Sequence, residues 1–494
     1  MSVPQEGFGD ELIKDPQQLI DFIASGCKPY SEWSFGVENE RFCYDLDTKR
    51  PLPYRGDNGG ASISAILEMM KNCFGYIGIY EDGYIIGLRR GNIGISLEPG
   101  GQLELAGAPL RSIAETEKEL LAYRQELLHL SRTLNVGFLN LGATPDWSLA
   151  DVPCMPKGRY RIMKNYMPKT GTSGLDMMFR TCTAQVNLDY SSEEDMVEKM
   201  RLGLKIQPIS TALFANSPLL GDGKPSGYVS RRADIWTRVD SDRTGFLPFV
   251  FKDGFGFKQW VEYALDVPMY FVCRGGKYID VAGHSFRNFL HGKLDALPGE
   301  LPMMSDWADH LTTLFPEARV KRFIEMRGAD CCMDSMICSL PAFWVGLLYD
   351  ATARAETQAI VGDWQIEECN DLRSQVTVQG LKTRIRGDAI LEITRELLKI
   401  AKRGLENRAR IDEGAGSNDA RFLEPLERIV DTGKTSAEEI VSRYYDSWKQ
   451  DIAHVYDDYG LSYRNCNDGE SMPSLEAIAD GCELFGDASR LRSK

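Results

Sequence analysis

Four short stretches of the sequence carry polar side chains at alternate positions inside an otherwise apolar run. In a β-strand, residues two apart point to the same side of the sheet. Each stretch would therefore present its polar pair on one face, and four such strands side by side would form a floor rich in carboxylates. The pairs are Glu38 and Glu40, Gln102 and Glu104, Gln185 and Asn187, and Glu325 and Arg327.

A carboxylate floor of this kind predicts a site for hard divalent cations. Buried carboxylates are costly unless they are paired or bind cations, and Mg²⁺ prefers oxygen ligands. The glutamates are predicted to hold Mg²⁺ and, through it, a nucleoside triphosphate. Gln185 and Asn187 would supply a neutral ligand or orient a phosphate, and Arg327 would face phosphate charge. For any single pair, a solvent-exposed strand face is an equally good interpretation.

Nucleotide-binding glycine loops do not explain how ATP would be held. Gly433-Lys434-Thr435 resembles the end of a phosphate-binding loop, but Arg428 stands where its first glycine is needed. No kinase-type glycine loop with its partner motifs is present. ATP would therefore be bound through the metal and scattered basic residues.

Arginines cluster in a loop-rich stretch, where surface ion pairs are the common arrangement. Beside an acidic floor, one of them could instead bind a substrate carboxylate through two parallel hydrogen bonds. The arginines are Arg231, Arg232, Arg238 and Arg243.

Composition narrows the classes of partner. The 494 residues are 43% hydrophobic and 26% charged, with a net charge of −15, which disfavours nucleic acid as a partner. The first residues lack a secretory signal pattern, and no apolar run approaches the length of a membrane helix. The 12 cysteines form no C-x-x-C pair and are predicted to be reduced cytosolic thiols, which indicates a cytoplasmic protein. Cys331 and Cys332 have no histidine nearby and are interpreted as two small, partly buried thiols.

The elements that must position these residues are a mixture of hairpins and long helices. Runs with Gly and Asp-Gly turns over 76–95 predict hairpin strands, and 179–189 predicts a strand. Residues 111–133 and 192–213 predict helices, as do 391–403, 437–449 and 451–457. The basic stretch 156–174 is predicted to be a mobile loop. This pattern favours an α+β fold over a doubly wound parallel sheet.

Longer motifs resemble one family, the plant and proteobacterial type of glutamate–cysteine ligase. The motifs that carry the resemblance are Ile95–Pro109, Gly174–Asp189, Asp242–Phe251, Tyr263–Tyr270, Glu325–Asp330 and Leu340–Trp344. The resemblance covers roughly 35–459. It implies a glutamine-synthetase-like fold, in which an antiparallel sheet forms a funnel surrounded by helices. It also implies one catalytic domain over 1–459 with a helical C-terminal part, followed by a polar tail at 460–494.

The family resemblance also implies a reaction and the roles of single residues. ATP and Mg²⁺ would serve a two-step synthesis of γ-glutamylcysteine, in which the side-chain carboxylate of glutamate is phosphorylated and the amine of cysteine then attacks. Arg327 matches the phosphate-facing arginine, and Arg232 matches the arginine that binds glutamate, with Asn187 as a neighbour. The positions that match metal ligands are Glu38, Glu40, Glu98, Glu104, Gln185 and Glu325.

Departures from the family pattern leave alternatives open. Asn39 stands where a histidine is usual, although it would point away from the metal pair. Cys331-Cys332-Met333-Asp334 replaces a Gly-Gly-Pro-Trp loop, so a different small amino acid as acceptor is the alternative reading. Val281 and Ala296 occupy the places of a redox-active cysteine pair, so that thiol switch should be absent. Small molecules are the expected partners, and both a monomer and a homodimer are compatible with the sequence.

Overall fold

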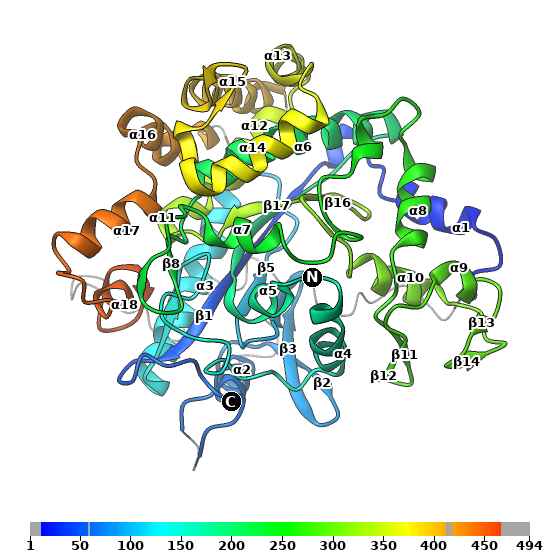
Figure 1. The fold of residues 1–494 in the computed structure, drawn as a ribbon, viewed down its shortest axis with the longest axis horizontal. Helices are drawn as coiled ribbons and strands as arrows, with labels where there is room; N and C mark the ends of the chain where they lie inside the picture. The colour runs from blue at the N-terminus through cyan, green and yellow to red at the C-terminus, as the bar shows by residue number, and fades with distance from the viewer. Residues whose placement is uncertain (1–10, 58–59, 412–415, 417, 466–494) are drawn as a thin grey trace.

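The computed structural model describes residues 11–465, apart from 58–59, 412–415 and 417. Within these ranges one sheet of ten antiparallel strands forms the centre of the molecule (Figure 1). Its main path runs β16-β17-β7-β1-β5-β4-β3-β2, and β6 pairs with the second half of β1 and with β20. The strands are β1 (Phe35–Asp45), β2 (Ile77–Glu81), β3 (Tyr84–Arg90), β4 (Ile93–Leu97), β5 (Leu103–Ala106), β6 (Val136–Leu139), β7 (Thr183–Leu188), β16 (Ala318–Val320), β17 (Ile324–Asp330) and β20 (Gly460–Leu461).

The order of the central strands brings the four polar pairs together. β17, β7, β1 and β5 are consecutive neighbours, and each of them carries one of the predicted stretches. The register places Glu38 opposite Gln185, Glu40 opposite Glu104 and Glu325 opposite Asn187. Directly opposite residues in an antiparallel pair share a face, so the predicted antiparallel floor is present.

Tight turns explain how the outer strands follow each other. The turn between β2 and β3 contains Asp82 and Gly83, both with positive φ (48° and 79°). Two consecutive positive φ angles suit the two-residue hairpin turns that match strand twist, and Asp-Gly supplies them at low cost. The predicted hairpins over 76–95 are therefore confirmed.

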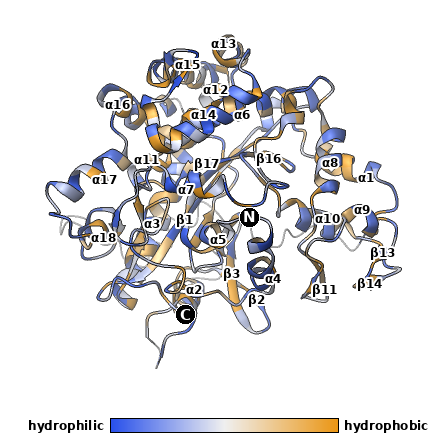
Figure 2. Ribbon diagram, in the orientation of Figure 1, coloured by the Kyte–Doolittle hydropathy of each residue, from blue (hydrophilic) through white to orange (hydrophobic). Residues whose placement is uncertain are grey.

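Helices cover the sheet and close two hydrophobic cores. α6 (Glu193–Leu213) packs on β17, and α12 (Ser339–Leu348) packs on α15 (Ile390–Ile411), in the group of helices at the top of Figure 1. α3 (Ile113–Leu134) begins with a capping box in which Ser112 and Glu115 satisfy each other's backbone amides. Along the outer helices, hydrophilic and hydrophobic residues alternate, as expected for elements with one face on a core (Figure 2).

The remaining elements are short or lie at the edges of the sheet. The other helices are α1 (Gln17–Ala24), α2 (Ile63–Cys73), α4 (Gly158–Tyr166), α5 (Gly174–Arg180), α7 (Arg231–Trp236), α8 (Phe257–Asp266), α9 (Phe286–Phe289), α10 (Met304–Leu311), α11 (Asp334–Ile337), α13 (Ala351–Val361), α14 (Ile366–Gln379), α16 (Glu424–Thr432), α17 (Ser436–Tyr445) and α18 (His454–Tyr459). The small two-stranded sheets are β8 (Leu219–Leu220) with β9 (Lys224–Pro225), β10 (Thr244–Gly245) with β15 (Phe315–Pro316), β11 (Phe271–Arg274) with β12 (Lys277–Asp280), β13 (Lys293–Leu294) with β14 (Leu297–Pro298), and β18 (Arg384–Ile385) with β19 (Asp388–Ala389).

Two predicted boundaries are corrected. The stretch 156–174 is not a loop, because α4 and a 3₁₀ turn (Met167–Lys169) occupy most of it, and α4 is anchored where the Gly158 amide donates to the Glu81 carboxylate. The predicted tail does not begin at 460, because Gly460 and Leu461 pair with β6. Residues 466–494 lie outside the described part of the chain.

None of the described helices is by itself long and apolar enough to cross a bilayer. Among the described residues, one pair of helices, Asp334–Leu348 with Ala351–Val361, has the combined length and composition of a span but is bent by 89° at the break.

Candidate active site

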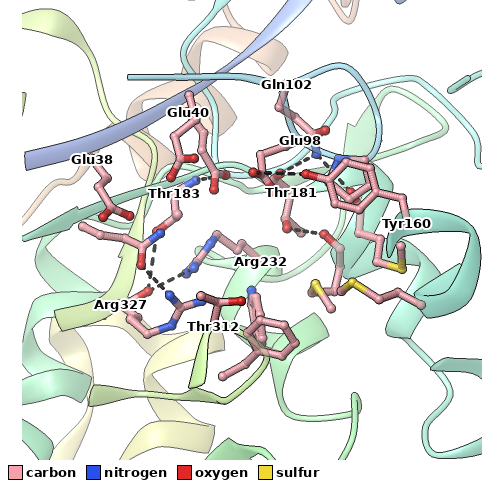
Figure 3. A pocket seen from close by; sticks show the side chains of 18 of the residues that line it. Glu38, Glu40, Glu98, Gln102, Tyr160, Thr181, Thr183, Arg232, Thr312 and Arg327 are labelled. Atoms are coloured by element: carbon pink, nitrogen blue, oxygen red, sulfur yellow. Dashed lines mark hydrogen bonds between the residues drawn. The ribbon is translucent and has the colours of Figure 1, made fainter. Parts of the chain in front are cut away.

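One cavity opens above the polar face of the central strands, and its two sides carry opposite charge. Figure 3 shows Glu38, Glu40 and Glu98 on one side and Arg232 and Arg327 on the other. Oxygen-bearing side chains on the acidic side are Glu38, Glu40, Glu98, Gln102, Glu104 and Gln185. Arginines that line the cavity are Arg159, Arg232, Arg319 and Arg327.

Most residues on the acidic side of the cavity lie on neighbouring strands of the sheet. Glu38 and Glu40 come from β1, Glu104 from β5 and Gln185 from β7. Glu98 stands in the turn between β4 and β5, where its amide donates to the Gln102 carbonyl and its carbonyl accepts from Gly101. Gly101 has a φ of 86°, which the tight turn requires and which only glycine adopts without strain.

Ionising the carboxyl groups of Glu40 and Glu104 on the acidic side is unfavourable. Burial, with the neighbouring Glu98 and Glu104, raises the pKa of Glu40 well above its usual range. Burial also raises the pKa of Glu104 to about 7, with Glu38 and Glu98 adding to the shift. Short donors offset only part of this cost, because Glu104 accepts from Ser96 Oγ (2.6 Å) and Glu40 accepts from the Thr183 amide (3.0 Å).

This donor set fits Mg²⁺ bound together with phosphate. In the described ranges no three His, Cys, Asp or Glu side chains stand close enough together to enclose a metal ion. Mg²⁺ does not need such a cage, since it commonly binds one or two carboxylates and takes its other oxygens from water and substrate phosphates. The acidic side carries four carboxylates and two amides, and a bound cation would offset the burial and mutual repulsion that raise the pKa values of Glu40 and Glu104.

The arginines on the opposite side are fixed by different partners. Arg327 donates to Gln185 Oε1 at 2.7 Å and pairs with Glu325. Arg232, which is 3% exposed, donates to the Arg327 carbonyl at 3.0 Å. The Nε atom of Arg232 is buried without a hydrogen-bond partner in the described part of the protein. Arg232 therefore combines a buried donor that has no partner among the described residues with a place on the cavity wall.

Two predicted site residues do not line the cavity. Glu325 is fully buried and pairs with Arg319 (2.7 Å), Lys321 (2.9 Å) and Arg327. Burial alone would raise the pKa of Glu325, but these cations lower it well below the usual range. Asn187 lies beside Glu38 and donates to its Oε1 at 2.9 Å.

The other basic residues of the predicted cluster have structural partners. Arg231 and Arg238 both pair with Asp234. Arg243 is fully buried, where it pairs with Asp240 at 2.8 Å and donates to the Pro268 carbonyl at 2.7 Å. Arg232 is therefore the member of the cluster that reaches the cavity.

The loop that follows β17 packs behind the sheet. The Cys331 thiol lies 3.7 Å from Asn39 Oδ1, on the face of β1 opposite Glu38 and Glu40, and Asp334 pairs with Arg41 at 2.5 Å. Burial raises the pKa of Cys331, so its thiol stays protonated. Neither Cys331 nor Cys332 lines the cavity, which removes the reason to expect this loop at the acceptor.

Sequence reasoning missed several residues of the cavity. Arg319, Arg159 and Tyr160 line it, as do Thr183 and Trp236. Arg319 stands on β16, six residues before Glu325, with no motif to distinguish it from a surface arginine. Arg159 and Tyr160 fall in the stretch predicted to be a mobile loop.

A family model decides the assignment of the chain. The model of glutamate–cysteine ligase family 2 (GCS2) matches residues 34–458. The chain belongs to this family. The GCS2 family joins glutamate to cysteine, which confirms the predicted enzyme class and reaction.

Curated relatives of this GCS2 protein cover most of its length. It is 50% identical over 442 residues to the chloroplastic glutamate–cysteine ligase of Medicago truncatula, covering 90% of this chain and 84% of the relative. It is 48% identical to chloroplastic glutamate–cysteine ligase B of Oryza sativa subsp. japonica, covering 89% and 86%. The cytoplasmic location predicted from the sequence is wrong by this comparison, because these relatives are named as chloroplastic enzymes.

A solved structure agrees with the fold. The glutamate–cysteine ligase of Francisella tularensis, crystallised with AMP, aligns with a TM-score of 0.55 at 14% identity, covering 93% of this chain and 94% of that one. The predicted α+β fold with a large antiparallel sheet and surrounding helices is confirmed for this GCS2 protein.

Proposed function

We propose that this protein uses ATP to join the γ-carboxyl group of glutamate to the amino group of cysteine, through a γ-glutamyl phosphate, in the first step of glutathione synthesis. The observation that carries the proposal is the charge-divided cavity, with Glu38, Glu40 and Glu104 on strands of the sheet floor and Arg232 and Arg327 opposite. A triphosphate with its metal suits the acidic side, and an amino acid carboxylate suits the basic side.

The metal would be held by the acidic side of the cavity. Bound Mg²⁺ would neutralise charge on the triphosphate and on the phosphoryl group being transferred. Glu325 is a predicted ligand that would first have to exchange its contacts with Arg319 and Lys321 for the metal. Asn187 would act through the orientation of Glu38. The ligands we propose are Glu38, Glu40, Glu98, Glu104 and Gln185.

Arg232 and Arg327 would have different roles, one in binding substrate and the other in stabilising charge. Arg232 would bind the α-carboxylate of glutamate, since its unpartnered Nε offers a buried donor. Arg327 is held between Gln185 and Glu325, so its guanidinium is oriented before substrate arrives. We propose that Arg327 stabilises negative charge on the phosphoryl group as it is transferred.

The proposed reaction has two steps. An oxygen of the glutamate γ-carboxylate attacks the γ-phosphorus of ATP, and ADP leaves. The cysteine amine then attacks the acyl carbon, the C–O bond to phosphate breaks, and the amine loses a proton. Inorganic phosphate and γ-glutamylcysteine are the products.

Replacing Glu40 with Gln tests the function. The variant should lose at least about 100-fold in kcat, because one charge that faces the metal is removed while size is kept. ADP release and γ-glutamylcysteine formation would be measured together. Glu396→Gln is the matched control, since Glu396 is exposed on α15, pairs with Lys399 and does not line the cavity. Normal turnover in Glu40→Gln would contradict the metal assignment.

The acceptor is tested by competition between small amino acids. We expect cysteine to give the highest kcat/KM, ahead of 2-aminobutyrate and other small amino acids. A better acceptor than cysteine would favour a γ-glutamyl ligase of specialised metabolism.

The domain organisation, oligomeric state and location of the protein in the cell can also be proposed. We propose one catalytic domain over the matched region, with small molecules as partners and a monomer or homodimer in solution, which sedimentation would distinguish. The chloroplastic names of the relatives support a plastid location, which fractionation of the source cells would test.

A further inference from the structure

Glu98 is the one proposed metal ligand that no strand of the sheet carries. It stands in the turn between β4 and β5, half-buried, and a turn does not orient a side chain as a strand does. Ser96 Oγ donates to Glu98 Oε1 at 3.1 Å, but Ser96 also serves Glu104 at 2.6 Å. Something outside the sheet must therefore hold Glu98.

The start of α4 supplies that support. Tyr160, which is 2% exposed, donates its hydroxyl to the Leu97 carbonyl at 2.6 Å and reaches Glu98 Oε1 at 3.4 Å. Leu97 directly precedes Glu98, so one hydroxyl contacts both the backbone and the carboxylate of the turn. Figure 3 shows Tyr160 beside Glu98 on the wall of the cavity.

A buried lysine completes the arrangement. Lys157 is 3% exposed, and its ammonium donates to the same Leu97 carbonyl at 3.2 Å and to the Tyr160 hydroxyl at 3.3 Å. Burying an ammonium is costly unless negative charge lies near. Burial lowers the pKa of Lys157 to about 8, and Glu98 opposes this shift, so the two charges stabilise each other.

We infer that Tyr160, supported by Lys157, is a positioning residue that fixes the orientation of Glu98 toward Mg²⁺. This inference rests on the proposed function, because it assumes that Glu98 contacts the metal. It gives a role to the two buried polar side chains at the start of α4, Lys157 at the N-cap and Tyr160 in the first turn. Residues that orient metal ligands commonly change metal affinity by roughly 10–100-fold when removed.

The test is Mg²⁺ binding to Tyr160→Phe, which removes the hydroxyl and keeps the ring. Titration calorimetry with a non-hydrolysable ATP analogue present should show Mg²⁺ affinity weaker by roughly tenfold or more than in the wild-type protein. The Mg²⁺ concentration needed for half-maximal activity should rise by a similar factor, and kcat should recover at saturating Mg²⁺. Tyr54→Phe is the matched control, because Tyr54 also donates to a backbone carbonyl (Ile85, 2.9 Å) but does not line the cavity.

A second variant protects the test against a folding defect. Lys157→Met keeps the apolar length of the side chain and should also weaken Mg²⁺ binding if the ammonium supports Tyr160. Unchanged Mg²⁺ affinity in a folded Tyr160→Phe protein would overturn the inference, and so would a loss of kcat that Mg²⁺ does not restore. A wild-type protein that neither binds nor needs Mg²⁺ would instead overturn the proposed function, so the two failures are distinguishable.

Discussion

Two buried glutamates on the same sheet, Glu104 and Glu325, have opposite electrostatic surroundings. Glu325 is neutralised by Arg319, Lys321 and Arg327, which hold its pKa well below the usual range. Glu104 has Ser96 as a donor but lies near Glu38 and Glu98, and burial raises its pKa to about 7. Both came from the same pattern of alternating polar residues. The difference lies in the neighbouring charges: cations surround Glu325, whereas Glu104 lies among other carboxylates on the cavity wall, where a cation would stabilise it.

The largest loss of stability is expected at Glu325, because Arg319, Lys321 and Arg327 compensate its charge. Glu325→Gln would leave the charges of Arg319 and Lys321 buried without their partner, which typically destabilises a protein by about 3–5 kcal/mol. The free energy of unfolding in urea, measured without metal, would report the loss. Unchanged stability would mean that the cluster on β16 and β17 does not hold the sheet together, and the comparison would fail.

Glu104→Gln should instead increase the free energy of unfolding of the metal-free protein. A carboxyl whose folded pKa is about 7 resists ionisation that the unfolded chain allows near 4.5, so stability falls as pH rises through this window. The variant should therefore be more stable by about 2–3 kcal/mol above pH 7 and gain nothing below pH 4.5. Urea unfolding at pH 4 and pH 8 with a chelator would show the difference.

Mg²⁺ with an ATP analogue should reverse this gain at Glu104. The wild-type protein would then be stabilised more than the variant, because only the carboxylate binds the cation well. A Glu104→Gln protein that is less stable without metal, or that keeps full activity, would contradict the interpretation of an uncompensated ligand.

Glu119 is a reference for Glu104, because it is a buried carboxylate that does not line the cavity. It accepts from the Ala108 amide at 2.9 Å, and burial raises its pKa to about 7. Glu119→Gln should stabilise the protein by about 2–3 kcal/mol above pH 7, as expected for Glu104→Gln, because the two carboxyls have the same pKa shift. Mg²⁺ and the ATP analogue should leave this gain unchanged. A metal-dependent gain would show that the cation acts on the sheet as a whole.

The carboxylates on the central strands could be predicted from the sequence, but the residues that surround them could not. Alternation of Glu38 with Glu40 is enough to place both on one face, whatever surrounds the strand. Arg319 and Tyr160 could not be predicted in this way, because their roles depend on contacts with Glu325 and with the Leu97 carbonyl. The stretch 156–174 was predicted to be a loop because its charges suggest exposure. In the structure Lys157 and Arg159 are buried, and their environment comes from distant elements.

The strands, the polar pairs that they carry and the family resemblance could all be predicted from the amino-acid sequence, because periodicity and long motifs are properties of adjacent residues. Which carboxylates are neutralised and which face the cavity became known from the folded structure. Charge compensation depends on how the strands and helices pack, because packing brings Lys157 close to the distant Glu98 and folds β16 back on β17 so that Arg319 reaches Glu325.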